Sequence, residues 1–386
     1  MPRLESDSLG ALDVPDEAYY GVQTLRALEN FPITGQRIHP SFIHALGHVK
    51  AASIEANHAI GHLPEELYKP LLQAASEMAE GKWDDQIMVD PIQGGAGTSL
   101  NMNANEVIAN RALELLGYPK GKYDVVHPNA HVNMAQSTND VIPTAFRIAF
   151  IERLGLTIKA LLGLQEALRQ KAAEFDGILK VGRTHLQDAV PIRLGQEFAA
   201  YAGAIGRDVA RIRAAREGLH TVNMGATAVG TGLNADPAYI EHVVMYLRER
   251  TGYPLELADD LVDATQNIDP LVHASAALRT CAVNLTKIAN DLRLMASGPT
   301  AGFGEIRLPA RQPGSSSRVA RWMSTAAATA PSRAASSANA IVPLTTIIRR
   351  PSSVVTPALL SAPELQFPEC HRRRSSWPSW RGSGRA

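Results

Sequence analysis

The sequence predicts an all-α protein whose long helices form a bundle. Apolar residues recur at three- and four-residue steps over long stretches, whereas the two-residue alternation of half-buried strands is scarce. Three such stretches, 140–174, 194–219 and 267–297, are longer than the average helix of a globular protein. Long helices of similar length joined by glycine-rich connections are typical of bundles, and their apolar faces favour oligomerisation.

The first two helices expected along the chain are short. Residues 64–80 open with Pro64 at a helix start. One stripe of this helix then carries Leu67, Leu71, Ala75 and Met78. Residues 105–116 form an amphipathic helix that Gly117 ends.

The longest predicted helix covers 140–174, about 50 Å at the helical rise per residue. Its apolar set is wide enough to need partners on more than one side: Phe146, Phe150, Leu154, Ile158, Leu161, Leu162 and Leu168. The helix over 194–219 follows, and Asp236-Pro237 starts another. The last helix, 267–297, carries one apolar stripe: Leu271, Leu278, Cys281, Leu285, Ile288, Leu292 and Met295.

Residues 318–386 differ in composition from the rest of the chain. They contain ten arginines and two glutamates but no lysine or aspartate, and serine, alanine and proline dominate between them. We interpret this change as out-of-frame translation or an assembly error, with a genuine disordered extension as the alternative. RNA binding by this Arg/Ser-rich tail is not favoured, because no module that combines aromatic and basic residues accompanies it.

The expected organisation therefore has three regions. Residues 1–135 form an N-terminal, mainly helical domain, and 136–317 form a central helical bundle. Residues 318–386 are the tail, so that the bundle is truncated and its remainder replaced after about residue 317. An incomplete bundle would expose the apolar stripes of 140–174 and 267–297.

Charge and composition exclude several classes of protein. The tail carries a net charge of +8 and residues 1–317 carry −8, so the body has no nucleic-acid-binding signature. Two cysteines, Cys281 and Cys370, imply no disulfide framework. The start of the chain does not have the pattern of a signal peptide, and no apolar run is long enough to span a membrane. We expect a cytoplasmic protein.

Two of four polar stretches that interrupt the helices lie in the first half of the chain. In 94–99, flexible glycines can bring backbone N–H groups and Thr98 close to an anion, although a helix N-terminus capped by Ser99 or Asn101 is the plainer interpretation. The second stretch, 131–140, places Ser137, Thr138 and Asn139 at the start of the longest helix. One of them must cap that helix, and three donors together with the helix dipole suit a carboxylate or phosphate.

The third and fourth stretches carry the remaining candidate residues. In 182–188, Thr184 and His185 precede a turn expected at Pro191–Gly195, and His185 could bind or protonate a substrate, although a lone histidine is more often structural. In 308–316, Gly314 and Pro313 adjoin Ser315 and Ser316, as in a mobile loop that covers a site, with an ordinary surface linker as the alternative.

Taken together and in this order, the four stretches resemble the fumarase/aspartase superfamily over residues 5–316. Within the superfamily the aspartase branch is the more similar. Thr138 stands where fumarases usually carry serine, and the stretches 260–267, 289–299 and 308–313 are similar to aspartases as well.

The resemblance implies reversible elimination of ammonia from L-aspartate to give fumarate, with no organic cofactor and no catalytic metal. It implies that Ser315 is the general base and that His185 is the second catalytic residue, one that also surrounds the ammonium group together with Thr98 and Asn139. The β-carboxylate would be held by Ser137, Thr138 and Ser316, and the α-carboxylate by Thr184. It further implies a homotetramer in which each site draws on three subunits.

The chain departs from the family where the loop should end. Arg321 falls in register with the family's lysine, Met323 with its asparagine, and Arg318-Val319 with its Met-Pro pair. An arginine fork is not equivalent to a lysine, and methionine cannot usefully bind a carboxylate. We therefore expect impaired activity. Fumarase activity is the alternative within the superfamily, and a non-catalytic structural or interaction protein is the alternative outside it.

Overall fold

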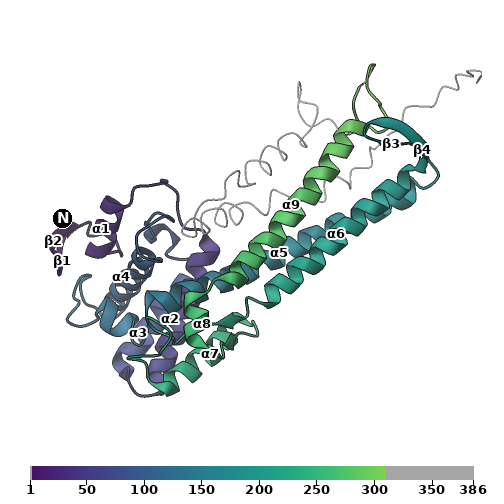
Figure 1. The fold of residues 1–386 in the computed structure, drawn as a ribbon. Helices are drawn as coiled ribbons and strands as arrows, with labels where there is room; N and C mark the ends of the chain where they lie inside the picture. Colours follow the sequence, from purple (N-terminus) through teal and green to yellow (C-terminus); the bar gives the residue numbers. More distant parts are fainter. Residues whose placement is uncertain (1, 299, 309–386) are drawn as a thin grey trace, which may run out of the picture.

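The computed structural model describes residues 2–298 and 300–308. These residues form a globular body and a bundle of three long helices that projects from it (Figure 1). The body contains the elements that precede the bundle along the chain and the short elements that lie between the second and third bundle helices. The bundle contains the longest helices. A β-hairpin lies at the end of the bundle that is farthest from the body.

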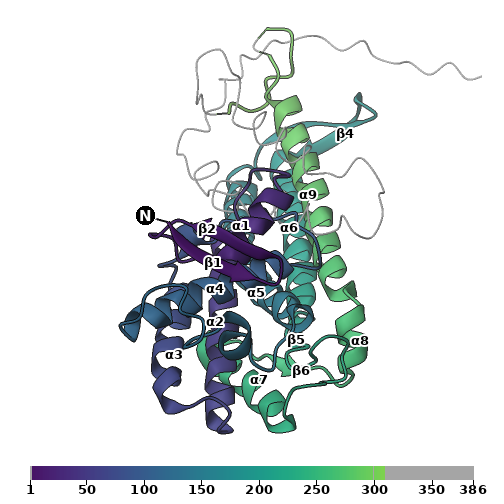
Figure 2. The ribbon, with the colours of Figure 1, turned by 90° about the vertical axis from the view of Figure 1, so that its left-hand side faces the viewer.

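The N-terminal part of the body begins with a two-stranded antiparallel hairpin, which faces the viewer in Figure 2. Its elements are β1 Arg3–Asp7, β2 Gly10–Val14, α1 Val22–Asn30, α2 Pro40–Ala59, α3 Glu65–Ala79 and α4 Thr98–Leu115, with a 3₁₀ turn at Asp84–Gln86 and a π-helical turn at Pro128–Val132. The His39 Nδ1 caps α2 by accepting a hydrogen bond from the Ser41 N–H over 3.1 Å.

The bundle consists of α5 Thr138–Glu174, α6 Leu194–Glu217 and α9 Asp269–Met295. With 37 residues, α5 is about 55 Å long. The hairpin of β3 Leu179–Thr184 and β4 Gln187–Arg193 connects α5 to α6. At this connection the backbones approach closely, since a Cβ at Gly195 would lie 2.3 Å from the Ala172 carbonyl oxygen. Only glycine fits this crossing.

The body is completed by elements that follow α6. They are β5 Thr221–Val222, α7 Pro237–Thr251, β6 Glu256–Leu257 and α8 Leu261–Gln266, and the two strands pair in parallel. Asp236 caps α7 by accepting a hydrogen bond from the Ala238 N–H over 2.9 Å. An ion pair joins α7 to α2, in which Arg250 Nη2 donates to Glu55 Oε1 over 2.8 Å.

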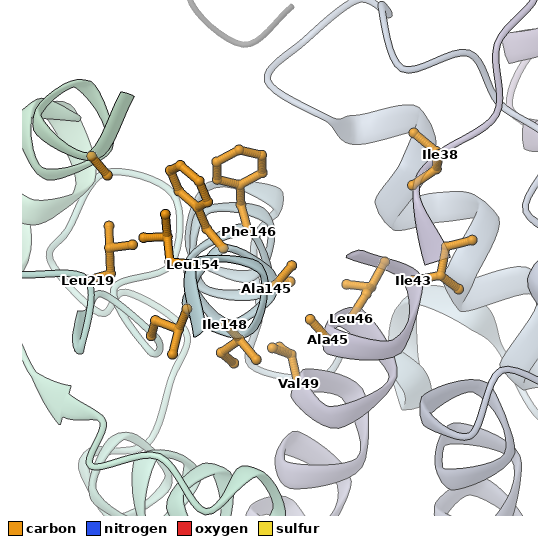
Figure 3. Close-up of a cluster of buried hydrophobic side chains, with 14 of the residues drawn as sticks. Ile38, Ile43, Ala45, Leu46, Val49, Ala145, Phe146, Ile148, Leu154 and Leu219 are labelled. Atoms are coloured by element: carbon orange, nitrogen blue, oxygen red, sulfur yellow. The ribbon is translucent and has the colours of Figure 1, made fainter. Parts of the chain in front are cut away.

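The core is continuous from the body into the bundle, because α5 belongs to both. Figure 3 shows where α2 packs against the first half of α5, through Ala45, Leu46 and Val49 on one side and Ala145 and Ile148 on the other. Each of the larger side chains here, such as Leu46 and Val49, contributes about 1.5–3 kcal/mol by leaving water, and the alanines contribute less. This contact fixes where α5 begins, and therefore where its polar N-terminus lies.

The all-α bundle predicted from the sequence is confirmed, and most expected helices are found close to their expected bounds. The prediction differs from the structure in several details. Helix 105–116 begins earlier, at Thr98, because Gly97 can take the left-handed φ of 100° that starts it. The helix α2 was not predicted, since it is buried on almost all sides and shows no amphipathic stripe. The turn expected at Pro191–Gly195 is instead strand β4 followed by α6.

The division into domains at 135 and 317 stays a prediction, and the tail 318–386 lies outside the described residues. Within the part of the chain that the structure describes, none of the helices has the length and apolar character needed to cross a membrane.

Candidate active site

The N-termini of α4 and α5 meet in the body, and they bring Thr98 into the same region as Ser137, Thr138 and Asn139. A Cβ at Gly97 would lie 2.9 Å from the Ile142 side chain, so the start of α4 rests directly on the first turn of α5. The Asn101 Nδ2 donates a hydrogen bond to Thr138 Oγ1 over 3.2 Å. Two helix N-termini with partial positive charge therefore lie together, as an anion site requires.

The cap of α5 uses only part of the hydrogen-bonding capacity of this cluster. Ser137 Oγ accepts from the Asn139 N–H over 3.2 Å, and Asp140 Oδ1 accepts from the Ser137 N–H over 2.9 Å. The bond from the Ser137 N–H to Asp140 is one half of a capping box, and the other half is the bond that the Ser137 side chain accepts from the Asp140 N–H. Ser137 and Thr138 are half-buried, so the stretch that caps the helix also leaves both residues partly accessible.

Asn139 links this helix end to the loop before α7. Its side-chain Nδ2 donates to the Ala228 carbonyl oxygen over 2.7 Å, while its backbone carbonyl oxygen accepts from Asn223 Nδ2 over 3.1 Å. The loop passes very close to α8, since a Cβ at Gly230 would lie 2.3 Å from Val262 Cα. The position of the Asn139 amide is therefore set by tertiary contacts as well as by the helix.

Two buried charged residues lie beneath the helix ends, and no sequence pattern indicated that either is buried. Lys50 of α2 is wholly buried, and its Nζ donates to Asn133 Oδ1 over 2.9 Å and to Gln136 Oε1 over 2.8 Å. Asp140 is also wholly buried, and its Oδ2 accepts from the Thr227 N–H over 2.9 Å. Burial lowers the pKa of Lys50 to about 7 and raises the pKa of Asp140 to about 6, and each opposes the shift of the other.

The depressed pKa of Lys50 gives a pH-dependence that can be measured. Between the folded pKa, about 7, and the unfolded value of 10.5, the unfolded chain binds a proton that the folded chain does not. Stability supplied by this residue therefore rises with pH from 7 upward, by roughly 1 kcal/mol for each pH unit. Asp140, with a pKa of about 6, is ionised in both states over this window and adds no slope.

We expect the difference in Tm between the unsubstituted chain and a Lys50→Met variant to increase from pH 7 to pH 9. Subtracting the two thermal unfolding series cancels the titration of every group that does not interact with Lys50, and Asp140 is the group that does. Lys82, which is exposed and paired with Glu80, provides the matched control as Lys82→Met. A difference that stays constant over this window would show that burial does not perturb Lys50.

Thr184 and His185 lie at the opposite end of α5 from the other candidates. His185 and Leu186 form the turn of the β3–β4 hairpin with φ of 51° and 64°, and both side chains are exposed. Positive φ at both central residues is the geometry of a tight hairpin turn. Because α5 separates this turn from Ser137 by about 55 Å, one chain does not bring the two groups together.

The hairpin is instead attached to the segment that leads towards residue 309. Lys180 Nζ lies 3.0 Å from Glu197 Oε2 and 3.1 Å from Glu305 Oε2. Arg183 also binds the Glu305 carboxylate with two nitrogens, and its guanidinium lies 3.8 Å from the centre of the Phe303 ring. Ser315 and Ser316 lie outside the described residues.

A cavity of about 590 Å³ opens beside the start of α4, and Thr98 and Ser99 form part of its wall. Its remaining polar lining includes Arg26, His127 and Asn129. The described residues contain no cluster of three or more histidine, cysteine, aspartate or glutamate side chains that could hold a metal ion.

A bundle of long helices whose donor-rich ends lie together belongs to the class of helical proteins that can bind a small anion between helices. The comparisons identify the family. A family model described as a lyase matches residues 10–317, and the chain belongs to this lyase family, part of the fumarase/aspartase superfamily.

Curated relatives agree with this assignment. Aspartate ammonia-lyases from Bacillus sp and Bacillus subtilis (strain 168) are 60% and 59% identical to the chain over 314 residues. The alignments cover 81% of this chain and 67% and 66% of those proteins, so the chain spans about two thirds of their length. The class II fumarate hydratase of Thermosynechococcus vestitus is 49% identical over 318 residues, which cover 81% of this chain and 68% of that protein.

Solved structures have the same fold. A fumarate lyase:delta crystallin from Brucella melitensis, bound to cobalt, matches with a TM-score of 0.83 and 43% identity, and the match covers 90% of this chain and 81% of that chain. The class II fumarase from Schistosoma mansoni matches with a TM-score of 0.81 and 31% identity, over 93% and 82% of the two chains.

Proposed function

We propose that this protein eliminates ammonia from L-aspartate to give fumarate. The single observation that carries the proposal is the meeting of two helix N-termini at Asn101 and Thr138, with Thr98, Ser137 and Asn139 beside them. The identity to aspartate ammonia-lyases supports the choice of L-aspartate over the other carboxylates that such a site could bind.

The chemistry explains why the site needs so many donors. The hydrogen on Cβ of aspartate is weakly acidic, and its removal places the electron pair of the C–H bond in the adjacent carboxylate. The resulting aci-carboxylate carries two negative charges until the C–N bond breaks and ammonia leaves. Fixed N–H and O–H donors aimed at that carboxylate stabilise it without reorganisation, and one such donor is typically worth about 3–4 kcal/mol.

In this proposal Ser315 accepts the proton from Cβ. Ser137, Thr138 and Ser316 hold the β-carboxylate and Thr184 holds the α-carboxylate. Thr98, Asn139 and His185 surround the ammonium group. Serine is a poor base unless nearby donors stabilise its alkoxide, so the environment of Ser315 must be dense in N–H groups when it reacts.

A complete site must draw on more than one chain. The hairpin with Thr184 and His185 is separated from the helix ends by the length of α5, and a partner chain packed along the bundle would supply the second group. We propose a homotetramer, in keeping with the expectation from the family, and a cytoplasmic location.

We also propose that turnover by this chain is impaired. In register with the family's loop, Arg321 and Met323 replace a lysine and an asparagine. Methionine donates no hydrogen bond to a carboxylate, and the guanidinium of arginine cannot take the place of a compact ammonium group.

The test is the ultraviolet absorbance of fumarate, measured with L-aspartate and separately with L-malate. We expect slow release of fumarate from L-aspartate, none from L-malate, and a large gain with L-aspartate when Ile-Met-Pro-Gly-Lys is introduced from position 317 together with Met323→Asn. Faster release from L-malate would assign the chain to the fumarases. No release from either substrate, with the altered loop as well, would favour a non-catalytic protein.

A further inference from the structure

Thr138 is held by a chain of hydrogen bonds that begins at a buried lysine. Lys50 Nζ donates to Asn133 Oδ1 over 2.9 Å, and Asn101 Nδ2 donates to the same oxygen over 3.1 Å. The second N–H of the Asn101 amide then donates to Thr138 Oγ1 over 3.2 Å. Lys50 of α2, Asn133 of the turn before α5 and Asn101 of α4 are thereby connected to Thr138, the first residue of α5.

Lys50 determines the direction of each of these hydrogen bonds. A lysine ammonium group has only donors, so the atom of Asn133 that faces it must be the carbonyl oxygen. That oxygen can only accept, which requires the Asn101 side chain to present its NH₂ group. A neutral amine keeps two N–H donors for these oxygens but also has a lone pair that can accept, so the ammonium form of Lys50 is the one that excludes the reverse direction.

The Asn133 amide cannot flip to reverse the direction of these hydrogen bonds. Its Nδ2 donates to the Gln136 carbonyl oxygen over 3.2 Å, and Gln136 Oε1 accepts the second bond from Lys50 over 2.8 Å. Exchanging the oxygen and nitrogen of Asn133 would set an NH₂ group against Lys50 and a carbonyl against a carbonyl. A buried group left unsatisfied in this way costs about 1–3 kcal/mol.

At the last of these hydrogen bonds, the Thr138 hydroxyl oxygen already accepts from Asn101. Among the described residues nothing accepts a hydrogen bond from its O–H group. The hydrogen is therefore free to be donated to a ligand at the helix end, where the helix dipole favours an acceptor with negative charge, such as a carboxylate.

We propose that Lys50 is a positioning residue, which acts through Asn133 and Asn101 to fix the Thr138 hydroxyl as a donor to a carboxylate of the substrate. The inference rests on the proposed function, because it assigns the ligand of Thr138 to that reaction. The proposal makes Lys50 necessary in addition to the residues of the family's loop. This buried amine in α2 does not touch the substrate, but it determines whether Thr138 can donate.

The first experiment measures fumarate binding to the purified chain by titration calorimetry. We expect Lys50→Met and Thr138→Val each to weaken binding by about 10- to 100-fold, the typical effect of losing a hydrogen bond to a charged group. In the Thr138→Val background, Lys50→Met should have no further effect. An equal loss from Lys50→Met in both backgrounds would overturn the proposal, since a purely structural role would not depend on Thr138.

A matched control comes from the same helix. Asn103 is a wholly buried asparagine of α4 that donates to the Gln86 carbonyl oxygen and accepts from the Met88 N–H, and neither partner belongs to the hydrogen bonds that hold Thr138. Asn103→Ala should lower Tm, and its effect on fumarate binding should be the same with threonine or valine at position 138. Asn101→Ala, in contrast, should lose its effect on binding when Thr138 is replaced.

The second experiment separates failure of the hydrogen-bonded link from Lys50 to Thr138, here called the relay, from failure of the proposed function. Thermal unfolding of Lys50→Met, Asn101→Ala and the double variant should be non-additive, with the double variant's Tm at least about 2 °C above the value expected from the two single shifts. Additive shifts would overturn the relay, whether or not fumarate binds. Coupled shifts in a chain that binds no fumarate would overturn the proposed function, and with it the assignment of a carboxylate to Thr138.

Discussion

Replacement of Ser315 by alanine is expected to lower kcat for L-aspartate by about 10³-fold or more, which is the usual contribution of a general base. The reason is that no other group would be left to take the proton from Cβ. The measurement requires turnover that can be followed accurately, so it is made in a chain that carries Ile-Met-Pro-Gly-Lys from position 317. Binding of fumarate should change little, because the base acts on a proton and not on the carboxylates.

Ser316→Ala provides the comparison for this prediction. It removes the same hydroxyl group from the neighbouring position, and in the proposed site that group holds the β-carboxylate. We expect this variant mainly to raise KM and to lower kcat by a smaller factor. Turnover by Ser315→Ala that matches the parent would remove Ser315 as the base.

The second large effect is expected at Asp140, where replacement by alanine should reduce the free energy of unfolding by about 3–5 kcal/mol. The carboxylate accepts hydrogen bonds from the backbone N–H groups of Ser137 and Thr227, and both would be left buried and unpaired. Lys50 would lose the opposite charge that favours its protonated form. The start of α5 and the loop that holds Asn139 should loosen together.

Denaturant unfolding measures this loss, with Asp236→Ala as the control. Asp236 also accepts a backbone hydrogen bond at the start of a helix, but its side chain is partly exposed and water can replace it. Its removal should cost only about 1 kcal/mol, as is typical of a helix cap. Equal losses at the two positions would mean that Asp140 is an ordinary cap and not a buried link between α5 and the loop.

The sequence predicted the bundle because its helices are amphipathic. The stretches 140–174, 194–219 and 267–297 each show apolar residues at helical spacing, and α5, α6 and α9 follow them to within a few residues. The helix α2 escaped because burial on nearly all sides removes the stripe that identifies a helix. The β3–β4 hairpin escaped because its residues are largely exposed and do not alternate between apolar and polar.

Part of the candidate site was also accessible from the sequence. Ser137, Thr138 and Asn139 precede the longest apolar pattern, so they were expected at a helix N-terminus, and the structure has them there. Thr98 was expected in a glycine-rich loop and lies at the start of α4. Asn101 had been considered only as a cap, whereas its amide joins α4 to α5.

The sequence by itself determined the three helices of the bundle, the donors at the start of α5 and the family, because each of these depends on residues that are close together along the chain. Only the tertiary structure decided that α4 and α5 meet end to end, that Lys50 and Asp140 lie buried beneath them, and that His185 lies at the far end of the bundle. These are contacts between residues separated by tens of positions, and their energies depend on burial and on the distance between atoms, which no local pattern records.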